Sequence, residues 1–86
     1  MPEESNKKEV KYSTKFEDDK DITPYLAAGI AEGFEESDNP KDEIHAWSYL
    51  IGTGQAYQLQ GWYGRNANSL IEAGWFDKDG TILKEA

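Results

Sequence analysis

The sequence has no cysteine and only one histidine, His45, among its 86 residues. Without cysteine the chain has neither a disulfide nor a thiolate metal cluster, and it lacks the usual pairs of nucleophile and base. A lone histidine on the polar flank of a helix is typical of a surface residue rather than of a catalyst. We therefore expect a protein that is not an enzyme, with no catalytic, cofactor-binding or metal-binding residues.

Long apolar runs are also missing. No stretch approaches the roughly 18 apolar residues that a membrane span requires. The segment from Met1 to Asp21 is too charged to be a signal peptide. We expect a soluble, cytoplasmic protein that does not bind membranes.

Positive charge is scarce, because nine Lys and Arg face 17 Asp and Glu and give a formal net charge of -8. Phosphate binding relies on clustered Lys and Arg, so direct contact with nucleic acid is disfavoured. A basic protein surface is the better electrostatic match. Between residues 22 and 46 only Lys41 offsets the acidic group Glu32, Glu35, Glu36, Asp38, Asp42 and Glu43.

The stretch from Trp47 to Phe76 is nearly free of charge, since Arg65 and Glu72 are its only ionised side chains. Its many rings must be buried and its Gln and Asn amides must find hydrogen-bond partners. We therefore predict that it forms the core and the edge of a contact surface. A domain of this size cannot hide every ring, and those least expected inside are Tyr57, Trp62, Tyr63 and Trp75.

Apolar periodicity predicts a small, mainly α domain over residues 22–86. Thr23 and Pro24 form a helix start, because the hydroxyl caps a free amide and proline loses no hydrogen bond at the first helical position. We predict helices over residues 24–35, 40–52 and 64–73, the last closed by Gly74, with a short helical turn at residues 55–60. The predicted core contains Leu26, Ile30, Phe34, Ile44, Trp47, Leu50, Ile51, Leu59, Ala67, Leu70 and Ile71.

Both ends of the chain allow alternatives. Residues 1–21 have the composition of a polar tail, yet residues 10–16 alternate between apolar and polar as in an edge strand. The segment Asp77–Gly80 predicts a turn rather than a calcium loop, because the EF-hand spacing fails at its sixth and twelfth positions. Residues 81–83 then double back as a hairpin, cover the helices, or pair with the first strand in a minor two-stranded element.

Three residues fit poorly in the helices predicted for them. Gly29 and Gly33 lie beside the apolar stripe of the first helix, which indicates either a flat groove or a broken helix. Arg65 opposes the dipole near a helix start, so we expect it to form an ion pair or a carbonyl contact within the fold, with Glu72 or with the acidic first helix. The alternative is that Arg65 anchors a bound macromolecule.

About a third of the chain resembles a known family. The segment from Ala46 to Phe76 reads AWSYLIGTGQAYQLQGWYGRNANSLIEAGWF. It is similar to the core of a family of short, mostly uncharacterised proteins of tailed phages, including cyanophages. The shared pattern consists of Ala46-Trp47, Tyr49-Leu50, Thr53-Gly54, Gln58-Leu59-Gln60-Gly61, Tyr63-Gly64-Arg65, Ala67, and Leu70-Ile71 before Gly74. This resemblance implies a phage origin and a compact helical core, and it carries no agreed activity.

Two classes of function follow from these patterns. The first is a phage accessory protein in the host cytoplasm that binds and modulates a host protein, as an inhibitor or as a mimic of nucleic acid on a basic nucleic-acid-binding surface. The predicted partner-binding residues are Tyr57, Gln58, Trp62, Tyr63, Arg65, Trp75, Glu32, Glu35, Glu36 and Asp38. The second is a self-associating scaffold component, a homodimer through the ring-rich surface. A helix-turn-helix unit over residues 55–73 is less favoured, because Arg65 is its only cation.

Overall fold

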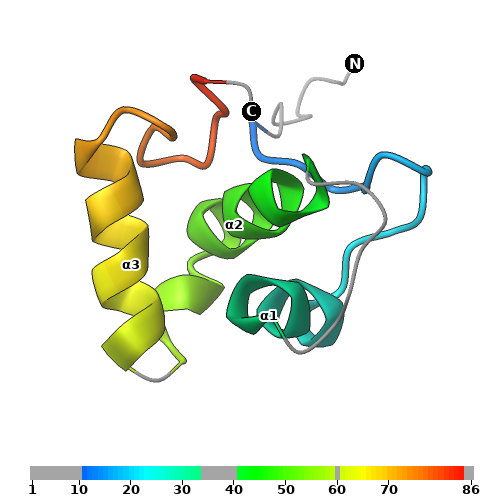
Figure 1. Ribbon diagram of the computed structural model, residues 1–86, viewed down its shortest axis with the longest axis horizontal. Coiled ribbons are helices and arrows are strands. Elements are labelled where there is room, and N and C mark those ends of the chain that lie inside the picture. Colours follow the sequence, from blue (N-terminus) through cyan, green and yellow to red (C-terminus); the bar gives the residue numbers. More distant parts are fainter. Residues whose placement is uncertain (1–10, 34–40, 60, 85–86) are drawn as a thin grey trace, which may run out of the picture.

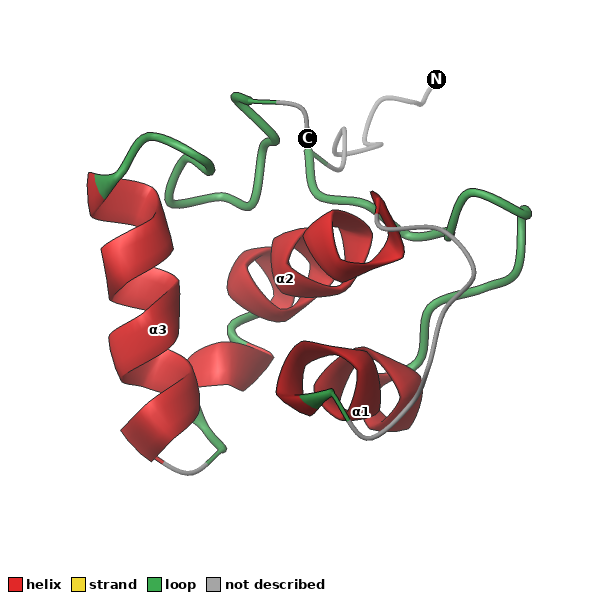
Figure 2. Ribbon diagram, viewed as in Figure 1, coloured by secondary structure: helices red, strands yellow, loops and turns green. Residues whose placement is uncertain are grey.

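The protein is a mainly helical domain, as the sequence predicts. The computed structural model describes residues 11–33, 41–59 and 61–84, and these form helices α1 (Pro24–Glu32), α2 (Lys41–Thr53) and α3 (Gly61–Glu72) and the 3-10 turn η1 (Gln55–Tyr57) (Figure 1). No strand occurs within these ranges (Figure 2). Helix α2 lies between the other two, with α1 packed directly against it and α3 meeting it through aromatic side chains.

Helix α1 begins and ends at residues with clear local causes. The Thr23 hydroxyl accepts a hydrogen bond from the amide of Leu26 at 3.2 Å, and Pro24 occupies the first turn. At the other end Gly33 adopts a left-handed backbone with φ 86°, and its amide bonds the carbonyls of Gly29 and Ile30. Gly33 is therefore the residue that ends the helix, earlier than the predicted end at Glu35, which lies outside the described residues.

Helix α2 is the most buried element. Asp42 and Glu43 lie in its first turn, where negative charge favours the helix dipole. Its inward face consists of Ala46, Trp47, Ser48, Leu50 and Ile51, all buried. The helix ends where Gly54 takes up a left-handed conformation and leads into η1. The predicted span of 40–52 is confirmed to within one residue.

Helix α3 begins at Gly61, three residues before the predicted start, so Trp62 and Tyr63 belong to its first turn. It buries Tyr63 and Ala67. Gly74, with φ 87°, follows the helix as predicted. The ammonium of Lys84 donates a hydrogen bond to the Ala73 carbonyl at 2.9 Å, which places a cation at the negative end of the dipole.

The core includes residues that helix periodicity did not predict. Phe16, Ile22 and Phe76 are buried although none belongs to a helix. The prediction that Leu59 belongs to the core is wrong. Leu59 is 38% exposed, because it lies in the turn between η1 and α3 rather than on a helix face. The other predicted core residues are buried (Trp47, Leu50, Ile51, Ala67) or packed against the core with partial exposure (Leu26, Ile30, Ile44, Leu70, Ile71), and Phe34 lies outside the described residues.

The segments before α1 and after α3 form single bridges instead of strands. Residues Lys15 and Asp21 form one isolated antiparallel bridge, and Phe76 and Ile82 form the other. The predicted edge strand is therefore absent among residues 11–16, and Val10 lies outside the described part. The predicted turn after Phe76 is confirmed, since the Gly80 amide bonds the Asp77 carbonyl at 3.0 Å and residues 81–83 double back.

Candidate interaction surface

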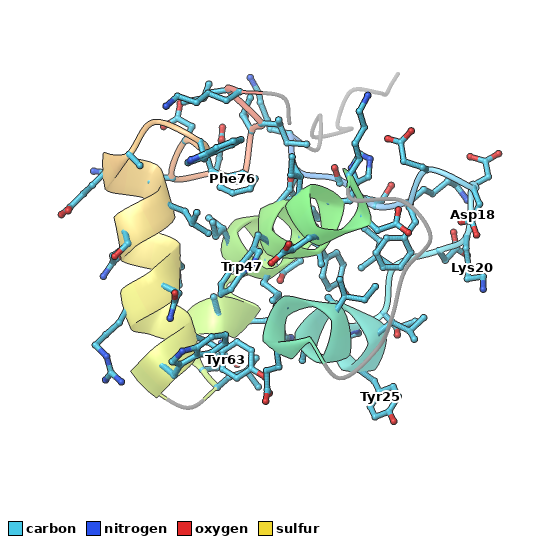
Figure 3. The ribbon with its side chains drawn as sticks, in the orientation of Figure 1. Asp18, Lys20, Tyr25, Trp47, Tyr63 and Phe76 are labelled. Atoms are coloured by element: carbon cyan, nitrogen blue, oxygen red, sulfur yellow. The ribbon has the colours of Figure 1, made fainter. Side chains whose placement is uncertain are left out.

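Three rings from α2 and α3 hold these helices together. Trp47 and Tyr63 are buried, with 6% and 5% exposure, and their ring centroids are 6.4 Å apart. Trp62 lies against both of them, 6.0 Å from Trp47 and 5.0 Å from Tyr63, the latter in an edge-on arrangement. Such tilted and edge-on pairs are the favoured geometries for aromatic contacts. Figure 3 shows Trp47 on α2 and Tyr63 at the first turn of α3.

Three large apolar residues at or near this cluster in the sequence are exposed. Tyr57 is 48% exposed, Leu59 38% and Trp62 39%, and all three lie at η1 and the start of α3. We call these three residues the ring surface. The Tyr57 ring lies against Gly64, where an added Cβ would be 3.7 Å from the ring. Trp is highly buried on average in proteins, so the exposed indole of Trp62 is a candidate contact residue.

The other predicted site residues of the aromatic stretch divide into two groups. Gln58 and Arg65 are exposed, and Arg65 forms no ion pair with Glu72 or with any other residue that the structure describes. The predicted compensating partner of Arg65 is therefore absent from this part of the chain. Tyr63 lies inside and supports the ring surface without forming part of it. Trp75 is half-buried, with the ammonium of Lys84 5.4 Å from its ring centre.

The acidic group is described only in part. Glu32 and Glu43 are exposed on α1 and α2. Asp42 accepts a hydrogen bond from the Glu17 amide at 3.2 Å, so it has a structural role. Glu35, Glu36 and Asp38 lie outside the described residues.

His45 is partly buried and engaged at both ring nitrogens, unlike the surface residue that the sequence predicts. Its Nδ1 lies 2.8 Å from the Ser13 hydroxyl and its Nε2 lies 2.6 Å from a Glu17 carboxylate oxygen, with 19% of the His45 side chain exposed. A serine, a histidine and a carboxylate are also the parts of a hydrolase triad, but there Nε2 faces the serine and the serine amide helps to stabilise the oxyanion. Here the nitrogens are reversed, and the Ser13 amide donates to the hydroxyl of Ser48 at 2.9 Å. The arrangement therefore fits the docking of a segment better than catalysis.

The docked segment is an extended strap, residues 12–17, that runs antiparallel to α2. Its contacts follow one stripe of that helix, which we call the α2 stripe: Asp42, His45, Ser48 and Gly52. At the end of the stripe the Tyr12 ring covers Gly52, where a Cβ would collide with the ring. Tyr12 also meets Tyr49 edge-on, with ring centres 6.0 Å apart.

The turn over residues 77–80, which follows α3, contacts the same part of α2. The Ser48 hydroxyl donates to the Gly80 carbonyl at 2.6 Å. Gly80 has φ 88°, and a Cβ there would lie 2.6 Å from the Ser48 carbonyl and 2.7 Å from the Tyr12 Cβ. The strap, α2 and the last turn thus meet at one glycine-lined junction.

Apolar periodicity missed this junction because its residues are small or polar. The only signal in the sequence is the spacing of Ser48 and Gly52, four residues apart on one helix face. Spacing alone does not reveal which distant segment lies on that face.

Two exposed groups outside the ring surface have shifted pKa values. The hydrogen bond and charge of Asp21, 2.7 Å away, raise the pKa of Lys15 above its usual range. Hydrogen bonds from the side chain and the amide of Thr81 lower the pKa of Asp79. Lys15 and Asp79 belong to the segments before α1 and after α3, outside η1 and the start of α3.

The described residues contain no group of three or more His, Cys, Asp or Glu side chains placed to hold a metal ion. Within the same ranges, no helix has the length and apolarity needed to cross a bilayer. The helix-turn-helix unit, the less favoured alternative for residues 55–73, lacks its first helix, because Gln55–Tyr57 is a single 3-10 turn in front of α3, as the predicted short helical turn requires.

Fold and surface together define a small helical domain with an exposed ring surface at the start of α3. Residues 30–86 match the family described as "Domain of unknown function (DUF7417)", so the chain belongs to this family. The match contains α2, η1, α3 and the ring surface, whereas the strap precedes it. Comparisons with curated proteins and with solved structures give no match.

Proposed function

We propose that this protein is a small acidic accessory protein of a tailed phage that binds a host protein through the ring surface and modulates it in the host cytoplasm. One observation carries the proposal: Trp62 remains 39% exposed, and Tyr57 and Leu59, which are close to it in the sequence, are 48% and 38% exposed. Aromatic residues of this kind are the usual anchors of protein interfaces.

The ring surface is prepared for binding by the residues beneath it. Trp62 rests on Trp47 and Tyr63, both buried, so its ring loses little freedom when a partner covers it. Exposed Gln58 and Arg65 supply hydrogen-bond donors at the edge of the apolar residues.

Charge favours a basic partner. The net charge of -8 steers the chain toward a positive surface and away from nucleic acid. The acidic residues Glu32, Glu35, Glu36 and Asp38 would then act in steering, and in the strongest version of the proposal they stand in for phosphates. The resemblance of residues 46–76 to phage proteins supports the phage origin.

The decisive experiment compares capture by three tagged forms of the full chain: wild type, the double variant Tyr57→Ala/Trp62→Ala, and the control Tyr25→Ala. Tyr25 is 77% exposed on α1 and points away from the body of the protein (Figure 3), so its loss removes an exposed ring outside the ring surface. We expect one protein from a bacterial host lysate to be retained by wild type and the control and lost by the double variant. Equal retention by all three forms would contradict the proposal.

Self-association through the ring surface is the second candidate, because the same exposed Trp62 can meet its own copy across a two-fold axis. Light scattering on wild type and the double variant separates the two. A dimer that the double variant loses, together with no captured protein, favours the scaffold. A wild-type monomer favours the host-binding protein, and release of the captured protein at high salt favours the phosphate-mimicking version.

A further inference from the structure

The turn after α3 contains the only place in the sequence where an aspartate or an asparagine precedes a glycine, Asp79–Gly80. A carboxyl side chain followed by glycine is the arrangement most open to attack by the backbone, because glycine has no Cβ to shield its amide nitrogen. Asp79 is exposed, whereas Gly80 is buried in the junction with Ser48 and Tyr12. The pair therefore combines a reactive sequence with a position that the fold requires.

We propose that Asp79 is a modification site, at which the chain isomerises to isoaspartate when the turn over residues 77–80 opens, and that Thr81 suppresses this reaction in the folded protein. In the reaction the Gly80 amide nitrogen bonds to Cγ of Asp79, and the displaced hydroxyl leaves with the amide proton as water. Water then opens the resulting cyclic imide at the former backbone carbonyl. The product links Asp79 to Gly80 through its side chain and carries a free α-carboxyl. Water is lost and regained, so the mass of the chain is unchanged.

Hydrogen bonds in the folded turn hold the Asp79 carboxylate away from the reaction. Its Oδ1 accepts from the Thr81 amide at 3.0 Å and from the Thr81 hydroxyl at 2.6 Å, and we call these two bonds the Thr81 clasp. They direct the carboxylate toward residue 81 rather than toward the amide nitrogen of Gly80. The bonds from the Thr81 side chain and amide also lower the pKa of Asp79, and an ionised carboxylate has no hydroxyl to lose. The clasp therefore opposes ring closure by position and by charge.

The second reacting group, the Gly80 amide, is also engaged. It donates to the Asp77 carbonyl at 3.0 Å. Ring closure turns this nitrogen toward the Asp79 side chain, so the hydrogen bond across the turn has to break first. Gly80 is also fixed on α2, because its carbonyl accepts from the Ser48 hydroxyl at 2.6 Å. The reaction thus requires local opening, and its rate follows the population of the open turn.

The product does not fit the junction. Isoaspartate lengthens the backbone between residues 79 and 80 by a methylene group. Gly80 has no space for such a change, because an added Cβ there would already lie 2.6 Å from the Ser48 carbonyl and 2.9 Å from the Cα of Gly52. We expect a chain that isomerises while open to unfold more readily afterwards, since Gly80 no longer reaches its place on α2.

The first test compares folded and denatured wild-type protein. The full chain is incubated at one temperature in neutral buffer and in guanidinium chloride, and isoaspartate is measured at each aspartate by electron-transfer mass spectrometry of its peptides. In denaturant we expect Asp79 to isomerise faster than Asp77, whose next residue Lys78 has a shielding side chain. In the folded state we expect Asp79 to isomerise at least about tenfold more slowly than in denaturant. Equal rates in the two states, or no isoaspartate at residue 79 in denaturant, would overturn the proposal.

The second test removes the hydroxyl bond of the Thr81 clasp. Thr81→Val keeps the shape of the side chain and loses this bond, and Thr81→Ser keeps the hydroxyl as the matched control. In folded protein we expect Thr81→Val to form isoaspartate about threefold to tenfold faster than wild type, and Thr81→Ser to match wild type. In denaturant the variants and wild type should react alike, because position 81 lies beyond the glycine whose nitrogen reacts. An unchanged folded rate in Thr81→Val refutes the role of Thr81.

Circular dichroism and proteolysis separate the reaction from misfolding. If Thr81→Val fails to fold, Thr81→Ala takes its place with the same expected result, and the comparison of folded with denatured wild type needs neither variant. Brief proteolysis of aged wild type should degrade isomerised chains first, and equal isoaspartate in the surviving chains would contradict the loss of the Gly80 contacts. Replacement of Tyr57 and Trp62 should leave the isomerisation rate unchanged, so failure of the ring surface and failure of this proposal give different results.

Discussion

At the scale of single residues, Gly80 is constrained both by its backbone conformation and by its neighbours. Its positive φ of 88° disfavours any side chain, and an added Cβ would meet the Ser48 carbonyl at 2.6 Å and the Cα of Gly52 at 2.9 Å. Both neighbours are backbone atoms of α2, so they cannot move aside without shifting the helix. Two independent penalties therefore act at one position.

We expect Gly80→Ala to lower the free energy of unfolding by about 2–4 kcal/mol, from backbone strain together with overpacking. The control is Gly54→Ala, where φ is 82° but nothing lies within 4 Å of the added Cβ, so only the strain of about 1 kcal/mol applies. Urea denaturation of both variants measures the difference. Equal losses of unfolding free energy in the two variants would show that the close backbone neighbours of Gly80 do not contribute to the cost of the substitution.

At the scale of elements, the turn over residues 77–80 depends on pH. Asp79 accepts hydrogen bonds from the amide and hydroxyl of Thr81, at 3.0 Å and 2.6 Å, and these lower its pKa in the folded state. A carboxyl with a depressed folded pKa stabilises the protein above its unfolded pKa, and this stabilisation is lost as the pH falls through the folded pKa.

We therefore expect wild type to exceed Asp79→Asn in stability at neutral pH and the gap to close in acid below the ordinary carboxyl range. Urea denaturation at a series of pH values measures the gap. Asp18→Asn serves as a reference for losing one exposed acid in another turn. A gap that stays constant into acid would contradict the assigned role of the carboxylate.

Sequence patterns predicted the elements whose signals are local. Thr23, Pro24 and Gly74 mark helix ends through their own side-chain or backbone chemistry, and all three act as predicted. The strap was not predicted, because it is held by hydrogen bonds to His45 and Ser48 on a distant helix rather than by strand pairing. The alternating pattern of residues 10–16 does not describe this packing either, since Thr14 is exposed whereas Ser13 is partly buried.

At the scale of the whole molecule, the aromatic stretch contains both buried and exposed rings, and the prediction of which rings are buried was incomplete. Tyr63 and Trp62 are adjacent in sequence, yet one is buried and the other exposed. Both residues lie in the first turn of α3, where adjacent side chains point about 100° apart, and apolar periodicity placed the start of this helix one turn later. The ring surface was thus predictable as a region and not residue by residue.

The two Trp residues of the cluster should differ in their effect on stability. We expect Trp47→Ala to cost about 3–5 kcal/mol, as for a large buried ring, and Trp62→Ala to cost about 1 kcal/mol, since a substantial part of its area already faces water. Thermal and urea denaturation of both variants measure this. A comparable loss from Trp62→Ala would indicate that its ring serves mainly the fold, which would weaken its assignment as a binding anchor.

The contact of Tyr12 with Gly80 joins positions near the two ends of the chain. Closing so long a loop costs conformational entropy. We therefore expect this contact to form late in folding, after the helices have packed against one another. During synthesis the Tyr12 ring can make all of its contacts only after the turn over residues 77–80 has left the ribosome. The nascent protein therefore passes through a stage in which its helices have formed while the junction of Tyr12, α2 and Gly80 is still incomplete.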